Sequence, residues 1–261
     1  MSVLFGTMWL IGCSETPVIK GQVLDIWNNP IEGAMIQMEG EADSKSSDAK
    51  GEFSFPIANA TDKNLRFRAG STGYIHDVEV AVVAKEQDAE QLPTVVFHLY
   101  PEPKERGFYA VGSEQYIEIK GQDTDRIATK LEAYHGLNDI GKASFSTDQK
   151  QQFVFYSSLR KEQIKQMQLS LNELTFTEKE DLKGVLGETA VEVNLWTTKG
   201  SPISFGLRSL DQKNMYLLDF PEPLAKGVYA FHSGQFLSSA DPRKESDLPK
   251  ELQVAYPFEV K

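Results

Sequence analysis

Short runs in which apolar and polar residues alternate recur along most of this chain. The first is VIKGQVLDI, where Ile19, Gly21 and Val23 occupy alternate positions, and in a later run Phe53 and Phe55 do the same. A period of two places successive side chains on opposite faces of a strand, so each run predicts a strand with one face buried. Turn clusters such as Asn-Asn-Pro at 28–30 separate the runs. The pattern therefore predicts an all-β protein.

The composition limits the size and the partners of this fold. With 261 residues, 40% hydrophobic and 25% charged, the chain is ordinary for a folded protein and long enough for two domains. A single cysteine excludes an internal disulfide. The net charge of -11 argues against nucleic acid and against broad electrostatic adsorption to anionic lipid. The sequence has no run of about 20 apolar residues, so no membrane-spanning helix is expected.

The segment GQVLDIWNNPIEGAMIQMEGEADSKSSDAKGEFSF carries a specific pattern of glycines, aromatic residues and a proline. It resembles the carboxypeptidase regulatory-like family, whose pattern is G-x-V-x-D, then P-I-x-G-A-x-V, then T-D-x-x-G-x-F-x-F. This resemblance implies a transthyretin-like, seven-stranded β-sandwich over residues 17–101 and a non-catalytic accessory role. The matching positions are Gly21, Val23, Asp25, Pro30, Ile31, Gly33, Ala34, Asp48, Gly51, Phe53 and Phe55.

The only cysteine follows a short apolar run at the start of the chain. Leu10-Ile11-Gly12-Cys13 resembles the lipobox of bacterial lipoproteins. This implies a signal peptide over residues 1–12, acyl chains on Cys13 and a tether over residues 13–16. Ser14, rather than aspartate, favours the outer membrane. No Lys or Arg precedes the apolar run, so either the natural start lies upstream or the terminal amine supplies the only positive charge.

Residues 102–261 are expected to form a second, larger β-rich domain of no recognised family, with one or two short helices. One helix is expected over 123–136, because Ile127, Leu131 and Tyr134 share a helical face and Gly136 can end it. The second is expected within SLRKEQIKQ at 158–166.

Two segments of this chain repeat one motif. YPEPKERGFYAVGSEQY begins at Tyr100 and FPEPLAKGVYAFHSGQF begins at Phe220. We expect equivalent strand-turn-strand corners in which Tyr109 and Tyr229 pack within a sheet. A paired aromatic site made by these two tyrosines is the alternative.

The residues that usually carry catalysis are scattered. His76 has the H-x-x-E spacing with Glu79, but an odd separation on a strand puts the two side chains on opposite faces. The motifs of zinc proteases, serine hydrolases and nucleotide-binding proteins are absent. We therefore expect no catalytic, cofactor-binding or metal-binding residue.

These observations predict a lipid-anchored envelope protein that binds or scaffolds and is not an enzyme. Its partners would be the membrane, through Cys13, and an envelope protein or a glycan. Two alternatives stay open for residues 102–261. A hydrolase site would have to join His135 or His232 to two carboxylates, and a glycan site would need an aromatic platform containing Trp196 or Tyr134.

Overall fold

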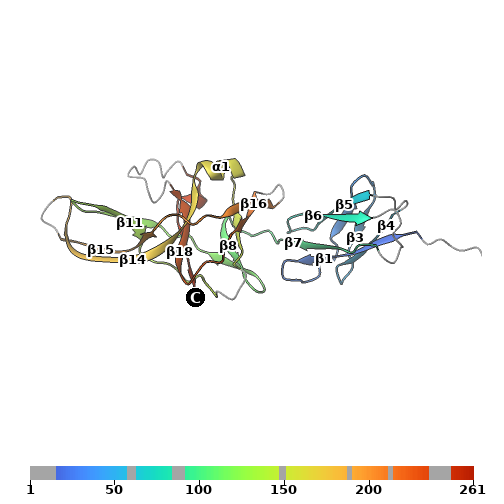
Figure 1. Ribbon diagram of the computed structural model, residues 1–261, viewed down its shortest axis with the longest axis horizontal. Coiled ribbons are helices and arrows are strands. Elements are labelled where there is room, and N and C mark those ends of the chain that lie inside the picture. Colours follow the sequence, from blue (N-terminus) through green and yellow to red (C-terminus); the bar gives the residue numbers. More distant parts are fainter. Residues whose placement is uncertain are drawn as a thin grey trace, which may run out of the picture. The chain divides into compact units, whose positions relative to one another are not determined.

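The computed structural model describes residues 16–57, 63–83, 92–146, 151–186, 190–210, 214–234 and 248–261. Their regular secondary structure is nearly all strand, with only two short helical elements among the described residues, which confirms the predicted all-β class. The chain divides into two compact units between Pro101 and Glu102 (Figure 1). Cys13 and the expected signal peptide lie outside the described residues. Within the described ranges, no helix is long and apolar enough to cross a membrane.

Unit 1 is a sandwich of two sheets. One sheet has the order β4-β1-β7 and the other has the order β3-β2-β5-β6, which agrees with the predicted seven-stranded sandwich. The inward-facing side chains of both sheets, such as Ile19, Phe67 and Phe97, form one buried cluster. The strands are β1 (Val18–Asp25), β2 (Met35–Met38), β3 (Ser44–Ser46), β4 (Glu52–Pro56), β5 (Lys63–Gly70), β6 (Asp77–Val83) and β7 (Val95–Leu99).

One glycine of unit 1 combines a left-handed backbone with a close approach to another strand. Gly51 has a φ of 74°, and a Cβ there would lie 2.4 Å from the carbonyl oxygen of Val23. Gly51 lies in the turn just before β4, beside β1. The backbone N–H of Val23 on β1 donates to the carbonyl oxygen of Gly51. Only glycine combines this left-handed backbone with so close a contact.

Unit 2 contains two larger sheets around an aromatic core. The sheets have the orders β10-β11-β15-β14-β18-β19-β12 and β16-β17-β13-β8-β9. The strands are β8 (Gly107–Val111), β9 (Tyr116–Ile119), β10 (Thr124–Ala128), β11 (Ala133–Leu137), β12 (Ser144–Phe145), β13 (Phe153–Tyr156), β14 (Leu169–Lys183), β15 (Ala190–Lys199), β16 (Gly206–Leu210), β17 (Met215–Asp219), β18 (Gly227–Ser233) and β19 (Tyr256–Val260); the helical elements are α1 (Lys161–Gln166) and the 3-10 turn η2 (Lys250–Leu252).

The helix expected over 123–136 is wrong, because this segment forms the β10–β11 hairpin. Ile127 pairs directly with Tyr134 across the hairpin, so their apparent helical spacing reflects cross-strand pairing. Gly136 does not cap a helix; a Cβ there would lie 2.3 Å from the carbonyl oxygen of Trp196 on the neighbouring β15. The second expected helix is confirmed as α1.

Candidate functional site

The two histidines of unit 2 lie on different strands, His135 on β11 and His232 on β18. His232 is buried, with Nδ1 3.0 Å from the carbonyl oxygen of Ser233 and Nε2 3.0 Å from Oδ1 of Asn172. Burial lowers the pKa of His232, so its ring is neutral at physiological pH. In the part of the chain that the structure describes, no three His, Cys, Asp or Glu side chains gather in a way that could hold a metal ion.

The buried carboxylates stabilise turns. Asp25 ends β1, and its Oδ1 accepts hydrogen bonds from the backbone N–H of Trp27 at 2.8 Å and of Asn29 at 2.9 Å. Its Oδ2 accepts from Nδ2 of Asn29 at 2.9 Å. This is an Asx-type turn, in which the carboxylate replaces a missing backbone acceptor.

Glu251 plays a comparable part near the end of the chain. Its Oε1 accepts from Oγ of Ser157 at 3.0 Å, and from N of Ser158 at 3.0 Å and Oγ of Ser158 at 2.7 Å. Burial raises the pKa of Glu251, but the hydrogen bonds from Ser158 and Ser157 outweigh this and hold the pKa below its ordinary value. The carboxylate ties the η2 turn to the loop after β13.

The two repeated tyrosines make the same contact in different sheets. Tyr109 donates from its hydroxyl to the carbonyl oxygen of Glu105 at 2.7 Å, and Tyr229 donates to that of Ala225 at 2.9 Å. In each case the acceptor lies four residues upstream, so the hydroxyl closes its own corner. Burial raises the pKa of Tyr109 to about 12, which keeps it a donor. Both side chains are buried, Tyr109 on β8 and Tyr229 on β18, and neither is available to a ligand.

Trp196 and Tyr134 do not share one platform. Trp196 lies opposite Phe176 across β15 and β14, with ring centroids 5.5 Å apart, and Phe176 is 48% exposed. Tyr134 instead accepts a hydrogen bond from Nζ of Lys179 at 2.7 Å. Because Lys179 is three residues from Phe176 on β14, its side chain leaves from the opposite face of that strand.

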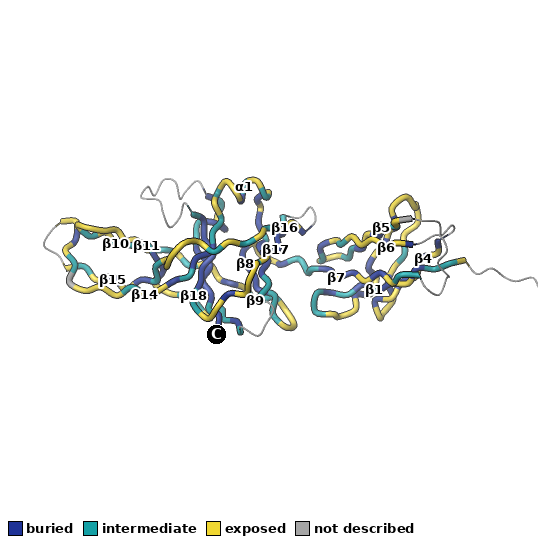
Figure 2. Tube along the Cα trace, viewed as in Figure 1, coloured by how far each residue is buried: buried dark blue, intermediate teal, exposed yellow. Residues whose placement is uncertain are grey.

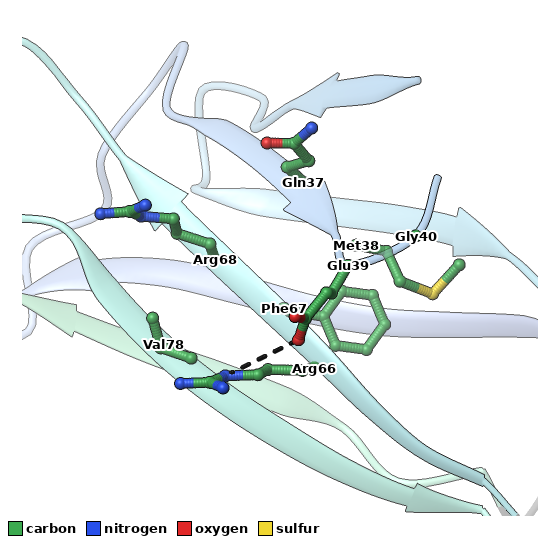
Figure 3. Close-up of a pocket in the computed structure, with 8 residues that line it drawn as sticks. All are labelled: Gln37, Met38, Glu39, Gly40, Arg66, Phe67, Arg68 and Val78. Carbon is green, nitrogen blue, oxygen red and sulfur yellow. Dashed lines mark ion pairs between the residues drawn. The ribbon is translucent and has the colours of Figure 1, made fainter. Parts of the chain in front are cut away.

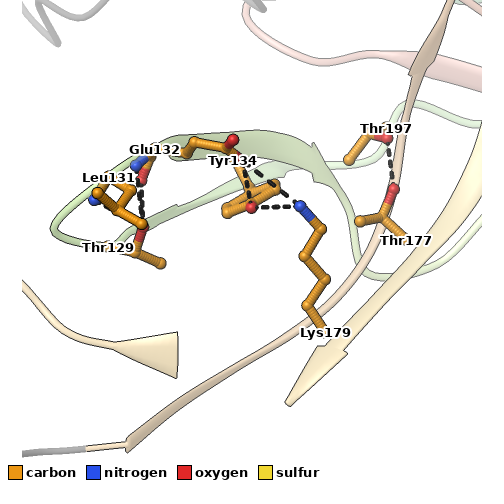
Figure 4. A network of polar contacts seen from close by, with 7 residues as sticks. All are labelled: Thr129, Leu131, Glu132, Tyr134, Thr177, Lys179 and Thr197. Atoms are coloured by element: carbon orange, nitrogen blue, oxygen red, sulfur yellow. Dashed lines mark hydrogen bonds and ion pairs between the residues drawn. The ribbon is translucent and has the colours of Figure 1, made fainter. Parts of the chain in front are cut away.

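The Tyr134 contact belongs to a polar network that holds the β10–β11 hairpin against β14 (Figure 4). The hydroxyl of Tyr134 donates to Oε2 of Glu132, and Lys179 contacts the same carboxylate at 3.4 Å. The hydrogen bond from Tyr134, followed by the charge of Lys179, lowers the pKa of Glu132. Its groups are exposed, so the network positions the hairpin and adds little to stability.

A different surface, in unit 1, carries exposed aliphatic side chains beside exposed charged ones. On the outer face of the β3-β2-β5-β6 sheet, β6 presents three exposed valines: Val78, Val80 and Val82 are 39%, 52% and 66% exposed. Arg66 and Arg68 of β5 lie directly across from Val80 and Val78. We call this surface the valine–arginine face.

The valine–arginine face contains a shallow groove of about 330 Å³. Figure 3 shows Arg66 and Arg68 beside Val78. Gln37 and Glu39 also line the groove, and a dashed line joins Glu39 to Arg66. Nε of Arg66 lies 3.9 Å from Oε2 of Glu39, and both side chains are more than half exposed. Such a solvated ion pair contributes little energy, so Arg66 can exchange it for another carboxylate at small cost.

This face was not predicted from the sequence. The β6 segment DVEVAVV is apolar on both faces, with Ala81 and Val83 buried and the other three valines exposed. The signal was the run of four apolar residues from Val80 to Val83, which is typical of a strand covered on both sides. In the structure only one side is covered by the core of unit 1.

Comparisons with known proteins add little to this description. No family model and no curated protein matches the chain. The chain is similar to a solved structure of a candidate carbohydrate-binding protein from Bacteroides uniformis, with 10% identity, 82% of this chain and 86% of that chain covered, and a TM-score of 0.23. A TM-score this low carries no argument about this chain.

Proposed function

We propose that this protein is a lipid-anchored, non-catalytic binding protein of the bacterial envelope, and that it binds a protein partner through the valine–arginine face. The observation that carries the proposal is the row of three exposed valines facing two exposed arginines on one sheet. Exposed aliphatic groups cost free energy in water and are common where a partner covers them.

The use of the buried polar groups supports a binding role over catalysis. Asp25 and Glu251 close turns, and His232 is held between Ser233 and Asn172. Among the described residues, every buried side-chain polar atom has a hydrogen-bond partner. An active site usually keeps polar groups poised for substrate, so groups already committed to the fold are poor candidates for acid–base chemistry.

The chemistry of the face indicates the chemistry of its partner. A partner segment that covers Val78, Val80 and Val82 must supply apolar side chains, each buried valine contributing on the order of 1 kcal/mol. Arg66 and Arg68 favour carboxylates beside those apolar groups, because guanidinium binds carboxylate with two parallel hydrogen bonds. We infer a partner segment that combines apolar and acidic residues.

Reversing the charge of both arginines should weaken this binding. We expect Arg66→Glu with Arg68→Glu to reduce co-purification of the partner by about tenfold or more, because attraction to carboxylates becomes repulsion. The matched control is Lys20→Glu with Lys50→Glu, which makes the same change in net charge at exposed positions elsewhere in unit 1. Equal loss in both double variants would contradict a role for the face.

The anchor has its own test. We expect Cys13→Ser to release the protein from the membrane fraction into the soluble fraction, because it removes the thiol that would carry the acyl chains. Fractionation with immunoblotting measures this, with Ser14→Ala as a control that leaves the thiol in place. Unchanged membrane association of Cys13→Ser would rule out the lipid anchor while leaving the valine–arginine face untested by that result.

A further inference from the structure

Two hairpins of unit 2 meet at their turns. Thr129, at the end of the β10–β11 hairpin, forms an isolated bridge with Gly184 of the β14–β15 hairpin. The backbone N of Lys130 donates to the carbonyl oxygen of Lys183 at 3.1 Å. We call the residues at this junction, Lys130, Leu131, Lys183, Val185 and Leu186, the hairpin tip. Figure 2 shows the ends of β10, β11, β14 and β15 as mostly exposed here.

The hairpin tip carries aliphatic side chains where polar residues are usual. Leu131 is 94% exposed, Leu186 is 96% exposed and Val185 is 63% exposed. Hairpin turns normally use Gly, Asn, Asp or Ser, which supply turn geometry and are well solvated. The three aliphatic side chains add nothing to the core of unit 2, so their exposure calls for a partner outside the chain.

Buried side chains and hydrogen bonds hold the strands and the turn next to the hairpin tip in place. Val193 and Leu195 of β15 are fully buried, on the same face of the ribbon from which Lys179 reaches Tyr134. Within the β10–β11 turn, the hydroxyl of Thr129 donates to the carbonyl oxygen of Glu132 at 2.8 Å and accepts from its N–H at 3.0 Å. These contacts fix the positions from which the leucines project.

We propose that the hairpin tip inserts into the headgroup region of an anionic lipid bilayer. Lys130 and Lys183 are exposed beside the aliphatic groups, although the whole chain carries a net charge of -11. Lysine stems lie along apolar surface while their ammonium groups reach lipid phosphates, and each contributes attraction to an anionic surface. The exposed carboxylate of Glu132 in the same turn is paired with Lys179 at 3.4 Å, so Lys130 and Lys183 remain the groups that attract an anionic surface.

The residue types favour lipid over a protein pocket. Energetically dominant residues of protein interfaces are enriched in Trp, Tyr and Arg, and the valine–arginine face has two arginines. The tip contains none of the enriched types and is a pair of turns, not a groove. A small aliphatic projection flanked by lysines matches the boundary between headgroups and acyl chains.

Fluorescence tests the insertion directly, since the chain has one cysteine. In the full-length Cys13→Ser chain, a cysteine introduced by Leu131→Cys or Leu186→Cys is labelled with the polarity-sensitive dye NBD. We expect blue-shifted, brighter emission with phosphatidylcholine vesicles that contain phosphatidylglycerol, and little change with phosphatidylcholine alone. Dye at Ser54→Cys, an exposed position on β4 of unit 1, is the control and should not respond.

Sedimentation with the same vesicles tests the residues themselves. In the Cys13→Ser background, Leu131→Asp with Leu186→Asp should weaken binding by about tenfold or more, and Lys130→Glu with Lys183→Glu should remove the preference for anionic lipid. Absence of any dye response at positions 131 and 186, or binding unchanged by both double variants, would overturn the proposal. So would a response at position 131 or 186 to a protein partner without lipid. Cys13 is absent throughout, so the outcome is independent of the anchor, and the valine–arginine face is intact.

Discussion

Replacing Phe231 by alanine is expected to lower the free energy of unfolding of unit 2 by about 4 kcal/mol. Phe231 is fully buried on β18, and its ring centroid lies 4.7 Å from that of Phe108, 5.4 Å from Phe153 and 5.5 Å from Phe258. Truncation removes the apolar burial and leaves a cavity that three large rings cannot collapse to fill.

Hydrogen exchange under native conditions measures this loss separately for each unit. We expect the slowest amides of unit 2 to exchange faster in Phe231→Ala while those of unit 1 are unchanged. Phe176→Ala is the control, since Phe176 is 48% exposed and its loss should cost about 1 kcal/mol or less. A loss below about 1 kcal/mol for Phe231→Ala would contradict the account of a single aromatic core in unit 2.

The second large effect is expected at Glu251. Its Oε1 accepts three hydrogen bonds from Ser157 and Ser158, two of them from Ser158. Glu251→Ala leaves these donors without an acceptor in a largely buried position, so we expect a loss of about 3 kcal/mol. Glu251→Gln keeps one oxygen acceptor for these donors while it removes the charge and replaces the other oxygen by an amide NH2, so its cost should be about half as large.

The pH dependence of stability separates the contribution of the charge of Glu251 from the contribution of the size and shape of its side chain. The pKa of Glu251 is lower in the folded protein than its ordinary value, so the ionised form stabilises the fold. This contribution is fully present above the ordinary carboxyl value of about 4.3 and is lost as the pH falls through the lower folded value. The free energies of unfolding of the wild type and of Glu251→Gln, measured by denaturation, should therefore converge at low pH. A constant difference between them at all pH values would contradict an ionised Glu251.

The sequence was enough to predict strands wherever one face is buried. The β1 segment alternates buried and less buried residues in the pattern that its apolar positions indicate. The β10–β11 hairpin was mistaken for a helix because Ile127 and Tyr134 are seven residues apart, a spacing that puts two residues on one face of a helix and that here pairs them across a hairpin. Only the partner strand β15, distant in sequence, resolves this choice.

The candidate surfaces were harder to predict for a related physical reason. In β6 both faces are apolar, so the pattern cannot say that Val80 is exposed while Ala81 is buried. At the hairpin tip, Leu131 satisfies a helical pattern in sequence, yet it projects from a turn in the structure. The equivalence of Tyr109 and Tyr229, in contrast, was predicted from a repeated motif. In the structure each hydroxyl donates to the carbonyl oxygen four residues upstream, so the repeat includes the acceptor.

Site-specific photocrosslinking in the native envelope tests the central claim, a protein-binding role for the valine–arginine face, most directly. Benzoylphenylalanine replaces Val80, which is 52% exposed at the centre of the face, and in a matched chain it replaces Ser54, which is exposed on β4 of the other sheet. We expect a discrete protein adduct from position 80 and none from position 54. No protein adduct from position 80, or the same adducts from both positions, would contradict the claim.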